Sequence, residues 1–158
     1  MTPQEAFNIN WNHFVVNKSP LGMIREGGKL NAPNFRCRYR TPDGCCCGIG
    51  VLFPPDIQLV LQEVDCPVGE LGCRLRDELN DGRLNGEQYN VANRILSGLK
   101  EPGKHPFSCF MEDLQSAHDG ARPQDDPEVP ACSSTRIDNR LSQLAIDYNL
   151  TIPETHVA

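Results

Sequence analysis

The chain has 158 residues, of which 39% are hydrophobic and 23% are charged. This composition excludes a disordered chain and predicts one domain with an ordinary core. The longest apolar runs are too short to cross a bilayer, and the first residues lack the basic start and apolar run of a signal peptide. We therefore expect a cytoplasmic protein that has no membrane partner and whose eight cysteines stay reduced.

Charge is unevenly distributed along the chain. The net charge is −6, yet the first 40 residues hold six Lys and Arg against two Asp and Glu, and the rest holds nine against nineteen. A basic segment on an acidic body predicts a polar partner or a self-complementary homodimer, and the plainer alternative is ordinary solvated surface. Direct DNA binding is disfavoured because most of the molecule is acidic.

The first predicted helix begins at residues 2–5, where Thr, Pro, Gln and Glu form the pattern of an N-cap, a helix-starting proline and a capping-box glutamate. Its apolar residues then fall on one helical stripe, formed by Phe7, Trp11, Phe14 and Val15. Residues 17–20 end this pattern, and the glycines and proline of residues 21–34 predict a loop.

A β-hairpin is predicted over residues 35–52. Arginines alternate with apolar residues along 35–40, which is the period of a strand with one buried face. The Pro-Asp-Gly sequence at 42–44 is typical of a type I turn closed by a left-handed glycine, and this loop pairs Arg40 with Cys46. In this register, one face of the hairpin is apolar and carries Phe35, Cys37, Tyr39, Cys45, Cys47, Ile49 and Val51. The opposite face carries Arg36, Arg38, Arg40, Cys46, Gly48 and Gly50.

Five helical segments are predicted after the hairpin, because apolar residues return at helical spacing between turn signals. They span about 56–64, 68–79, 87–96, 107–118 and, after a cap at Ser134, a last helix with the stripe Ile137, Leu141, Leu144, Ala145 and Tyr148. Residues 119–133 predict an acidic flexible loop, and residues 151–158 a tail. We therefore predict a single α+β domain, 1–158, in which one β-hairpin packs on a mainly helical body of about five helices.

The cysteines allow three interpretations. Most are expected to pack as small apolar residues, which is the commonest role of a free cysteine. Cys46 differs because the predicted register places it beside Arg40 and Arg38, and neighbouring cations lower the pKa of a thiol. That placement predicts a redox-sensitive or nucleophilic Cys46. No histidine or carboxylate is fixed beside it by the sequence, so the prediction leans away from an enzyme.

Zinc is the third interpretation of the cysteines. Cys45 and Cys47 are too close for the usual zinc knuckle, and Cys66 and Cys73 are too far apart. The remaining candidate set of ligands is Cys37, Cys47, Cys73 and His118. The sequence therefore predicts no cofactor, with zinc as the alternative.

The arginine face is the strongest candidate for a binding surface. Arg36, Arg38 and Arg40 share one side of the predicted strand, with Asp43 and Cys46 beside them at the turn. The fork of arginine suits phosphates and carboxylates, so this face could bind a nucleotide, a phosphorylated signal or an acidic protein surface. Arginine is also an ordinary residue on the solvent side of a strand.

His118 and Asp119 end the helix predicted over 107–118. His118 falls on its apolar stripe, which favours a packed histidine or one that caps the last carbonyls. As functional residues, the two could supply a base or a metal ligand.

Several of these residues together resemble a family of small phage and bacterial proteins. Those proteins pair a "C-x-Y-R…D-G…C-A-x-G…I-P-D" hairpin with a later "L-Q-x-x-H-D" helix and a final helix ending in "Y-G-L". The matching residues here are Cys37, Tyr39, Arg40, Asp43, Gly44, Cys47, Gly50, Pro54, Asp56, Leu114, Gln115, His118, Asp119, Tyr148, Asn149 and Leu150. Gly48 replaces the usual alanine, and Cys45 and Cys46 replace residues that are often polar. The resemblance implies a phage or prophage setting and carries no assigned activity.

The functional expectation follows from this setting and from the segregated charge. It is a phage or prophage accessory protein that binds a host protein and inhibits a bacterial defence system, in the manner of an anti-CRISPR. One alternative is a binder of a nucleotide or phosphorylated signal on the arginine face. The other is a zinc- or thiol-dependent protein.

Overall fold

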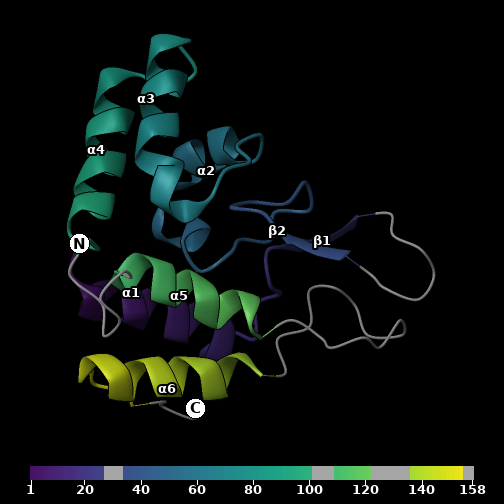
Figure 1. Ribbon diagram of the computed structural model, residues 1–158, viewed down its shortest axis with the longest axis vertical. Coiled ribbons are helices and arrows are strands. Elements are labelled where there is room, and N and C mark those ends of the chain that lie inside the picture. Colours follow the sequence, from purple (N-terminus) through teal and green to yellow (C-terminus); the bar gives the residue numbers. More distant parts are fainter. Residues whose placement is uncertain (27–33, 101–108, 122–135, 155–158) are drawn as a thin grey trace.

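The computed structural model describes residues 1–26, 34–100, 109–121 and 136–154, and within these ranges the fold is α+β, as predicted. Six α-helices and one two-stranded antiparallel hairpin are present in the described ranges. Helices α3 (Leu71–Asn80) and α4 (Gly86–Ser97) stand side by side at one end, and the hairpin projects from one side (Figure 1). No helix in these ranges is long and apolar enough to span a bilayer.

The N-terminal helix forms as the capping pattern predicts. Helix α1 (Pro3–Asn10) begins with a capping box, in which the Thr2 side chain accepts from the Glu5 amide and the Glu5 carboxylate accepts from the Thr2 amide. It continues directly into a π-helical segment, η1 (Trp11–Val16). Phe7, Trp11 and Phe14 are buried, which confirms the predicted stripe at those positions.

The turn of the predicted hairpin is confirmed. The Thr41 amide donates to the Cys45 carbonyl at 2.8 Å, and Gly44 has the left-handed φ of 86° that a bulged turn requires. Arg40 and Cys46 form an antiparallel bridge, as the register predicts.

The strand predicted after this turn is wrong. The chain leaves the pairing after Cys47 and forms a 3₁₀ turn, η2 (Gly50–Leu52). A Cβ added at Gly50 would lie 1.8 Å from the Tyr39 carbonyl oxygen, so this close approach of two backbones requires glycine. The partner of strand β2 (Asn34–Cys37) is instead β1 (Met23–Glu26), which lies in the segment predicted as a loop. The register pairs Met23 with Cys37.

The later helices agree with the apolar spacing. They are α2 (Pro55–Leu61), the 3₁₀ turn η3 (Val68–Glu70), α3, α4, α5 (Phe110–Asp119) and α6 (Ile137–Tyr148). Ile137, Leu141, Leu144 and Ala145 are buried on α6, as predicted. The cap at Ser134 and most of the acidic loop lie outside the described residues. The first residue of the predicted tail, Thr151, exchanges two hydrogen bonds with the Gln4 side chain.

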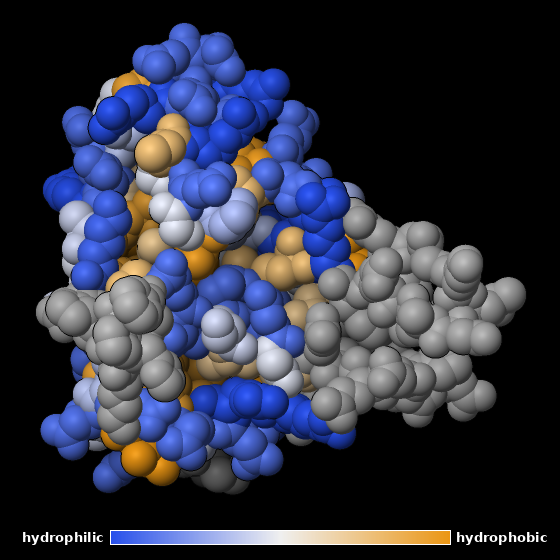
Figure 2. All heavy atoms as spheres, viewed as in Figure 1, coloured by the Kyte–Doolittle hydropathy of each residue, from blue (hydrophilic) through white to orange (hydrophobic). Residues whose placement is uncertain are grey.

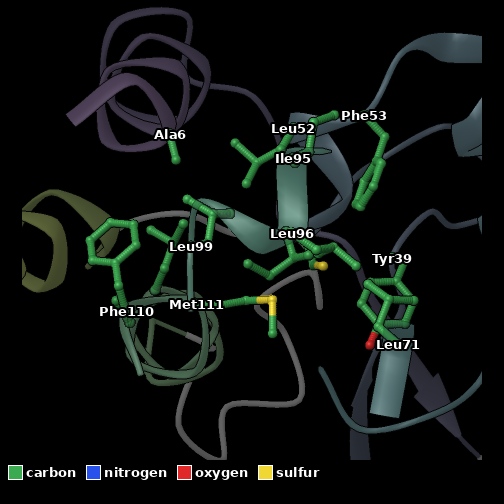
Figure 3. Packing of buried hydrophobic residues seen from close by; sticks show 14 of the residues in the cluster. Ala6, Tyr39, Leu52, Phe53, Leu71, Ile95, Leu96, Leu99, Phe110 and Met111 are labelled. Atoms are coloured by element: carbon green, nitrogen blue, oxygen red, sulfur yellow. The ribbon is translucent and has the colours of Figure 1, made fainter. Parts of the chain in front are cut away.

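One continuous cluster of buried side chains joins these elements. It reaches from Ala6 on α1 to Ala145 on α6. Figure 3 shows its centre, where Leu96 and Leu99, at and just after the end of α4, meet Phe110 and Met111 of α5. Hydrophilic side chains cover the outer faces of α3 and α4, as expected for helices with one buried stripe (Figure 2).

Candidate functional site

Five polar or thiol side chains meet where β2, the segment after the turn and the end of α5 come together. We call them the thiol–carboxylate cluster, and they are Cys37, Cys47, Gln115, His118 and Asp119. Gln115, His118 and Asp119 stand at positions i, i+3 and i+4 of α5, so they share one face of that helix. The cluster thus joins residues about 80 positions apart in the chain.

His118 is held in one tautomer. The side chain is 1% exposed, and its Nε2 accepts a hydrogen bond from the Gly22 amide at 3.2 Å. Because Nε2 is the acceptor, the ring proton is on Nδ1, which donates to Asp119 Oδ1 at 3.0 Å. The ring also packs against Phe14, with centroids 5.5 Å apart. The free lone pair that a general base needs is therefore already in use.

Gln115 links the carboxylate to a thiol. Its Nε2 lies 2.7 Å from Asp119 Oδ1 and 2.8 Å from Cys37 Sγ. Asp119 Oδ1 thus accepts from two side chains, although its residue remains partly exposed. Gln115 Oε1 is buried and has no hydrogen-bond partner among the described residues. A buried acceptor without a hydrogen bond costs about 1–3 kcal/mol, so Gln115 Oε1 is a destabilising group within the cluster.

Both thiols of the cluster accept hydrogen bonds from N–H donors. Cys47 is fully buried, and its Sγ accepts from the Gly50 amide at 3.3 Å. The pKa of Cys37 is raised, first by its hydrogen bond to the Cys47 sulfur and then by burial. A thiol in this state is a poor nucleophile because the thiolate is the reactive form.

Cys46 does not have the environment that the sequence predicts. It is 4% exposed, and its thiol lies 3.5 Å from Gln58 Oε1. Burial raises its pKa to about 11 and outweighs the opposite effect of Arg40. The prediction of an exposed thiol with a lowered pKa is wrong because Leu21 crosses the segment and forms a parallel bridge with Cys46.

The arginine face is compensated by acceptors from other elements. Arg36 contacts the Asp65 carboxylate, and Arg38 Nη1 lies 3.7 Å from the same group. Arg40 Nη1 donates to Gln58 Oε1 at 3.1 Å. An incoming phosphate would therefore compete with Asp65 for two of the three guanidinium groups.

A cavity of about 450 Å³ opens beside the cluster, between β2, residues 64–68 and the end of α5. Its lining side chains are Arg36, Cys37, Tyr39, Val64, Asp65, Cys66, Pro67, Val68, Gln115 and Asp119. The Tyr39 hydroxyl donates to the Cys66 carbonyl at 2.8 Å and fixes one wall. The cavity combines apolar walls with charges of both signs at its rim, which is the character of a binding pocket.

The structure brings together most, but not all, of the predicted site residues. Cys37, Cys47, His118 and Asp119 meet in the cluster, whereas Cys73 is exposed on α3. Asp43 is exposed at the turn. Asp65 and Cys66 are parts of the site that were not predicted from the sequence. The helical spacing of Gln115 with Asp119 was a usable signal for Gln115, but no local pattern marks Asp65, which follows the end of α2.

The chain matches no family model, no curated protein and no solved structure. The resemblance to small phage and bacterial proteins therefore stays a prediction. Five of the residues that carry it nevertheless converge in space, because they are the members of the thiol–carboxylate cluster.

Proposed function

We propose that this protein is a binding factor that attaches to another protein through the face around the cavity. The observation that supports it is the convergence of β2, residues 64–68 and α5 on one cavity of about 450 Å³. Val64 and Val68 supply apolar wall, and Arg36, Asp65 and Asp119 supply charged rim. Such a pocket fits an anchor side chain with an apolar stem and a polar end, which is the usual form of an interface hot spot.

The geometry favours binding over a phosphate site and over a thiol enzyme. A nucleotide or phosphate site on the arginine face is disfavoured because Asp65 already pairs with Arg36 and lies 3.7 Å from Arg38, so it competes with an incoming anion. A thiol enzyme is disfavoured because the pKa values of Cys37 and Cys46 are raised and because His118 Nε2 is an acceptor for the Gly22 amide.

The partner that we propose is a host protein in the bacterial cytoplasm. The resemblance supplies the setting of a phage or prophage accessory factor. Within that setting, a component of a host defence system, such as CRISPR–Cas, is the class of target that we propose. Binding would block the target sterically, since no reaction step is required of the cavity residues.

A capture experiment with matched variants tests the binding face. The tagged protein is incubated with host lysate, and retained proteins are quantified by mass spectrometry. Val68→Trp fills the cavity, whereas Leu59→Trp adds the same side chain at an exposed position (61%) on α2, away from the cavity lining. A true partner is retained by the wild type and by Leu59→Trp, and its affinity for purified Val68→Trp falls about tenfold or more. Equal retention by Val68→Trp, with both variants folded by circular dichroism, would exclude this face.

Defence inhibition is tested separately in cells. Expression of the wild type should restore plaque formation by a phage that the host defence targets, and Leu59→Trp should do the same. Val68→Trp should not. Unchanged plaque counts with the wild type, in a host whose lysate yields a partner, would reject defence inhibition and leave the binding face standing.

A further inference from the structure

We propose that Cys37, Cys47 and Asp119 form a binding site for a divalent cation of the zinc class, and that His118 is a positioning residue for Asp119. The proposal goes beyond protein binding and does not depend on it. It also differs from the ligand set predicted from the sequence, because Asp119 enters the set, Cys73 leaves it and His118 changes its role.

The ligand atoms lie near one another. One ligand atom each of Cys37, His118 and Asp119 lies within 4.8 Å of the other two. Cys47 lies outside that group, and its sulfur is hydrogen-bonded to Cys37. In a tetrahedral zinc site, with Zn–S about 2.3 Å and Zn–O about 2.0–2.2 Å, ligand atoms stand roughly 3.5–3.8 Å apart. To reach that spacing, the Cys47 sulfur must move toward the Asp119 carboxylate when the cation binds.

Hydrogen-bond donors already surround the three proposed ligands. Each of the three already accepts a hydrogen bond from an N–H donor: Cys37 from Gln115, Cys47 from the Gly50 amide, and Asp119 from Gln115 and His118. N–H donors stabilise negative charge on sulfur and oxygen. Both donors to Asp119 reach Oδ1, which leaves Oδ2 for a cation. Donors of this kind orient metal ligands.

The tautomer of His118 decides its role. A neutral imidazole that binds a metal through Nδ1 carries its proton on Nε2. That proton would face the Gly22 amide, which is itself a donor at 3.2 Å. His118 therefore fits as the donor to Asp119 and not as a ligand. The Gly22 amide keeps the Nδ1 proton aimed at the carboxylate.

Cation binding at this site would be coupled to the loss of protons from its thiols. Cation binding displaces the thiol protons of Cys37 and Cys47 into solvent and leaves two thiolates and one carboxylate around the ion. Cys37 and Asp119 also line the cavity, so the fourth position faces it and takes water or a ligand from there. The cation would tie β2, the segment after the turn and α5 together at the wall of the proposed binding face.

Cobalt titration of the full chain tests the proposal directly. The purified wild type, reduced and treated with chelator, is titrated with Co²⁺ and then with Zn²⁺. One Co²⁺ per chain should bind, with the visible bands of tetrahedral cobalt and a thiolate-to-cobalt charge-transfer band from two thiolates. Zn²⁺ should displace it. Failure of the wild type to bind one cation per chain, or a cobalt spectrum without the charge-transfer band, would overturn the site.

Variants separate the ligands from the positioning residue. Cys37→Ser and Cys47→Ser should each lower the charge-transfer band by about half or more, whereas Cys73→Ser should leave it unchanged. His118→Asn should weaken affinity about 10–100-fold and keep the band at saturation, as expected for a residue that orients a ligand. An unchanged band in a folded Cys37→Ser would reject the assignment. If the serine variants do not fold, zinc should slow alkylation of Cys37 and Cys47 in the wild type but not that of Cys73, and equal rates would reject it.

Discussion

The α3–α4 pair is specified by local interactions, whereas the thiol–carboxylate cluster is specified by contacts between distant segments. The α3–α4 pair is local: α4 begins with a capping box in which Asn85 and Gln88 exchange hydrogen bonds at 2.9 Å, and Gly82, between the helices, takes a left-handed φ of 74°. The cluster joins residues from Gly22 to Asp119 through single hydrogen bonds and a close backbone approach. Local signals therefore specify the first region, whereas the second depends on how distant segments cross.

This difference has consequences for tolerance to mutation. In the α3–α4 pair, each cap or turn contributes about 1 kcal/mol independently of the others. Next to the cluster, one methyl group added at Gly50 can displace several hydrogen-bonded groups at once. Gly50 lies against the Tyr39 backbone, and its amide also donates to the Cys47 sulfur. The predictions below test that asymmetry, from the largest expected effect to the smallest.

Gly50→Ala should cause the largest loss. The added Cβ would lie 1.8 Å from the Tyr39 carbonyl oxygen, so the backbones must separate. We expect a loss of about 4 kcal/mol or more in the free energy of unfolding, measured by urea denaturation. Gly72→Ala on α3 is the matched control, since nothing lies within 4 Å of its Cβ, and it should stabilise by roughly 0.5–1 kcal/mol. Equal effects at the two glycines would contradict the asymmetry.

Alkaline pH should lower the free energy of unfolding through ionisation of the Cys46 thiol. Its pKa rises from an ordinary 9.0 to about 11 on folding because the thiol is buried. Between these values the unfolded chain releases the thiol proton while the folded chain keeps it, so stability present below pH 9 is lost as the pH rises toward 11. Cys46→Ala should flatten this decline, by up to about 2 kcal/mol at the alkaline end, in urea titrations with chelator. A wild-type profile for Cys46→Ala would contradict the assignment.

Asn85→Ala should have a moderate effect confined to the α3–α4 pair. The substitution removes a side chain that accepts from the Gln88 amide at 2.9 Å. We expect a loss of about 1 kcal/mol in the free energy of unfolding. Asn93→Ala, at an exposed position inside α4, removes the same side chain without a cap and should stay within about 0.5 kcal/mol of the wild type. A loss at Asn93 as large as that at Asn85 would show that the cap is not the cause.

Asp65→Asn should have the smallest effect on stability among these substitutions, although it removes a negative charge beside the arginines. Its ion pairs with Arg36 and Arg38 are partly exposed, so the loss should be no more than about 1 kcal/mol. The substitution also removes the charge that competes with phosphate at both arginines. In thermal-shift assays, a nucleotide should therefore stabilise Asp65→Asn more than the wild type. A strong shift with the wild type itself would instead support the nucleotide alternative.

Several features of the cluster could be anticipated only in part. Cys37, Cys47 and His118 could be predicted as candidate ligands from the sequence, and the helical spacing explains why Gln115 and Asp119 lie together. It wrongly placed Cys46 on an exposed face, because alternation along one strand cannot reveal that Leu21 covers it. It also missed the partner of β2, because β1 lies in a segment rich in turn signals.

The amino-acid sequence by itself determined the local elements: the capped start of α1, the turn closed by Gly44, and the apolar stripes of the later helices. Each depends on residues within a few positions of one another, so propensity and spacing suffice. Only the tertiary structure decided that β1 pairs with β2, that Asp65 compensates Arg36, and that Gly22 sets the tautomer of His118. These contacts join residues 8 or more positions apart, and their geometry follows from packing around one core and not from any local pattern.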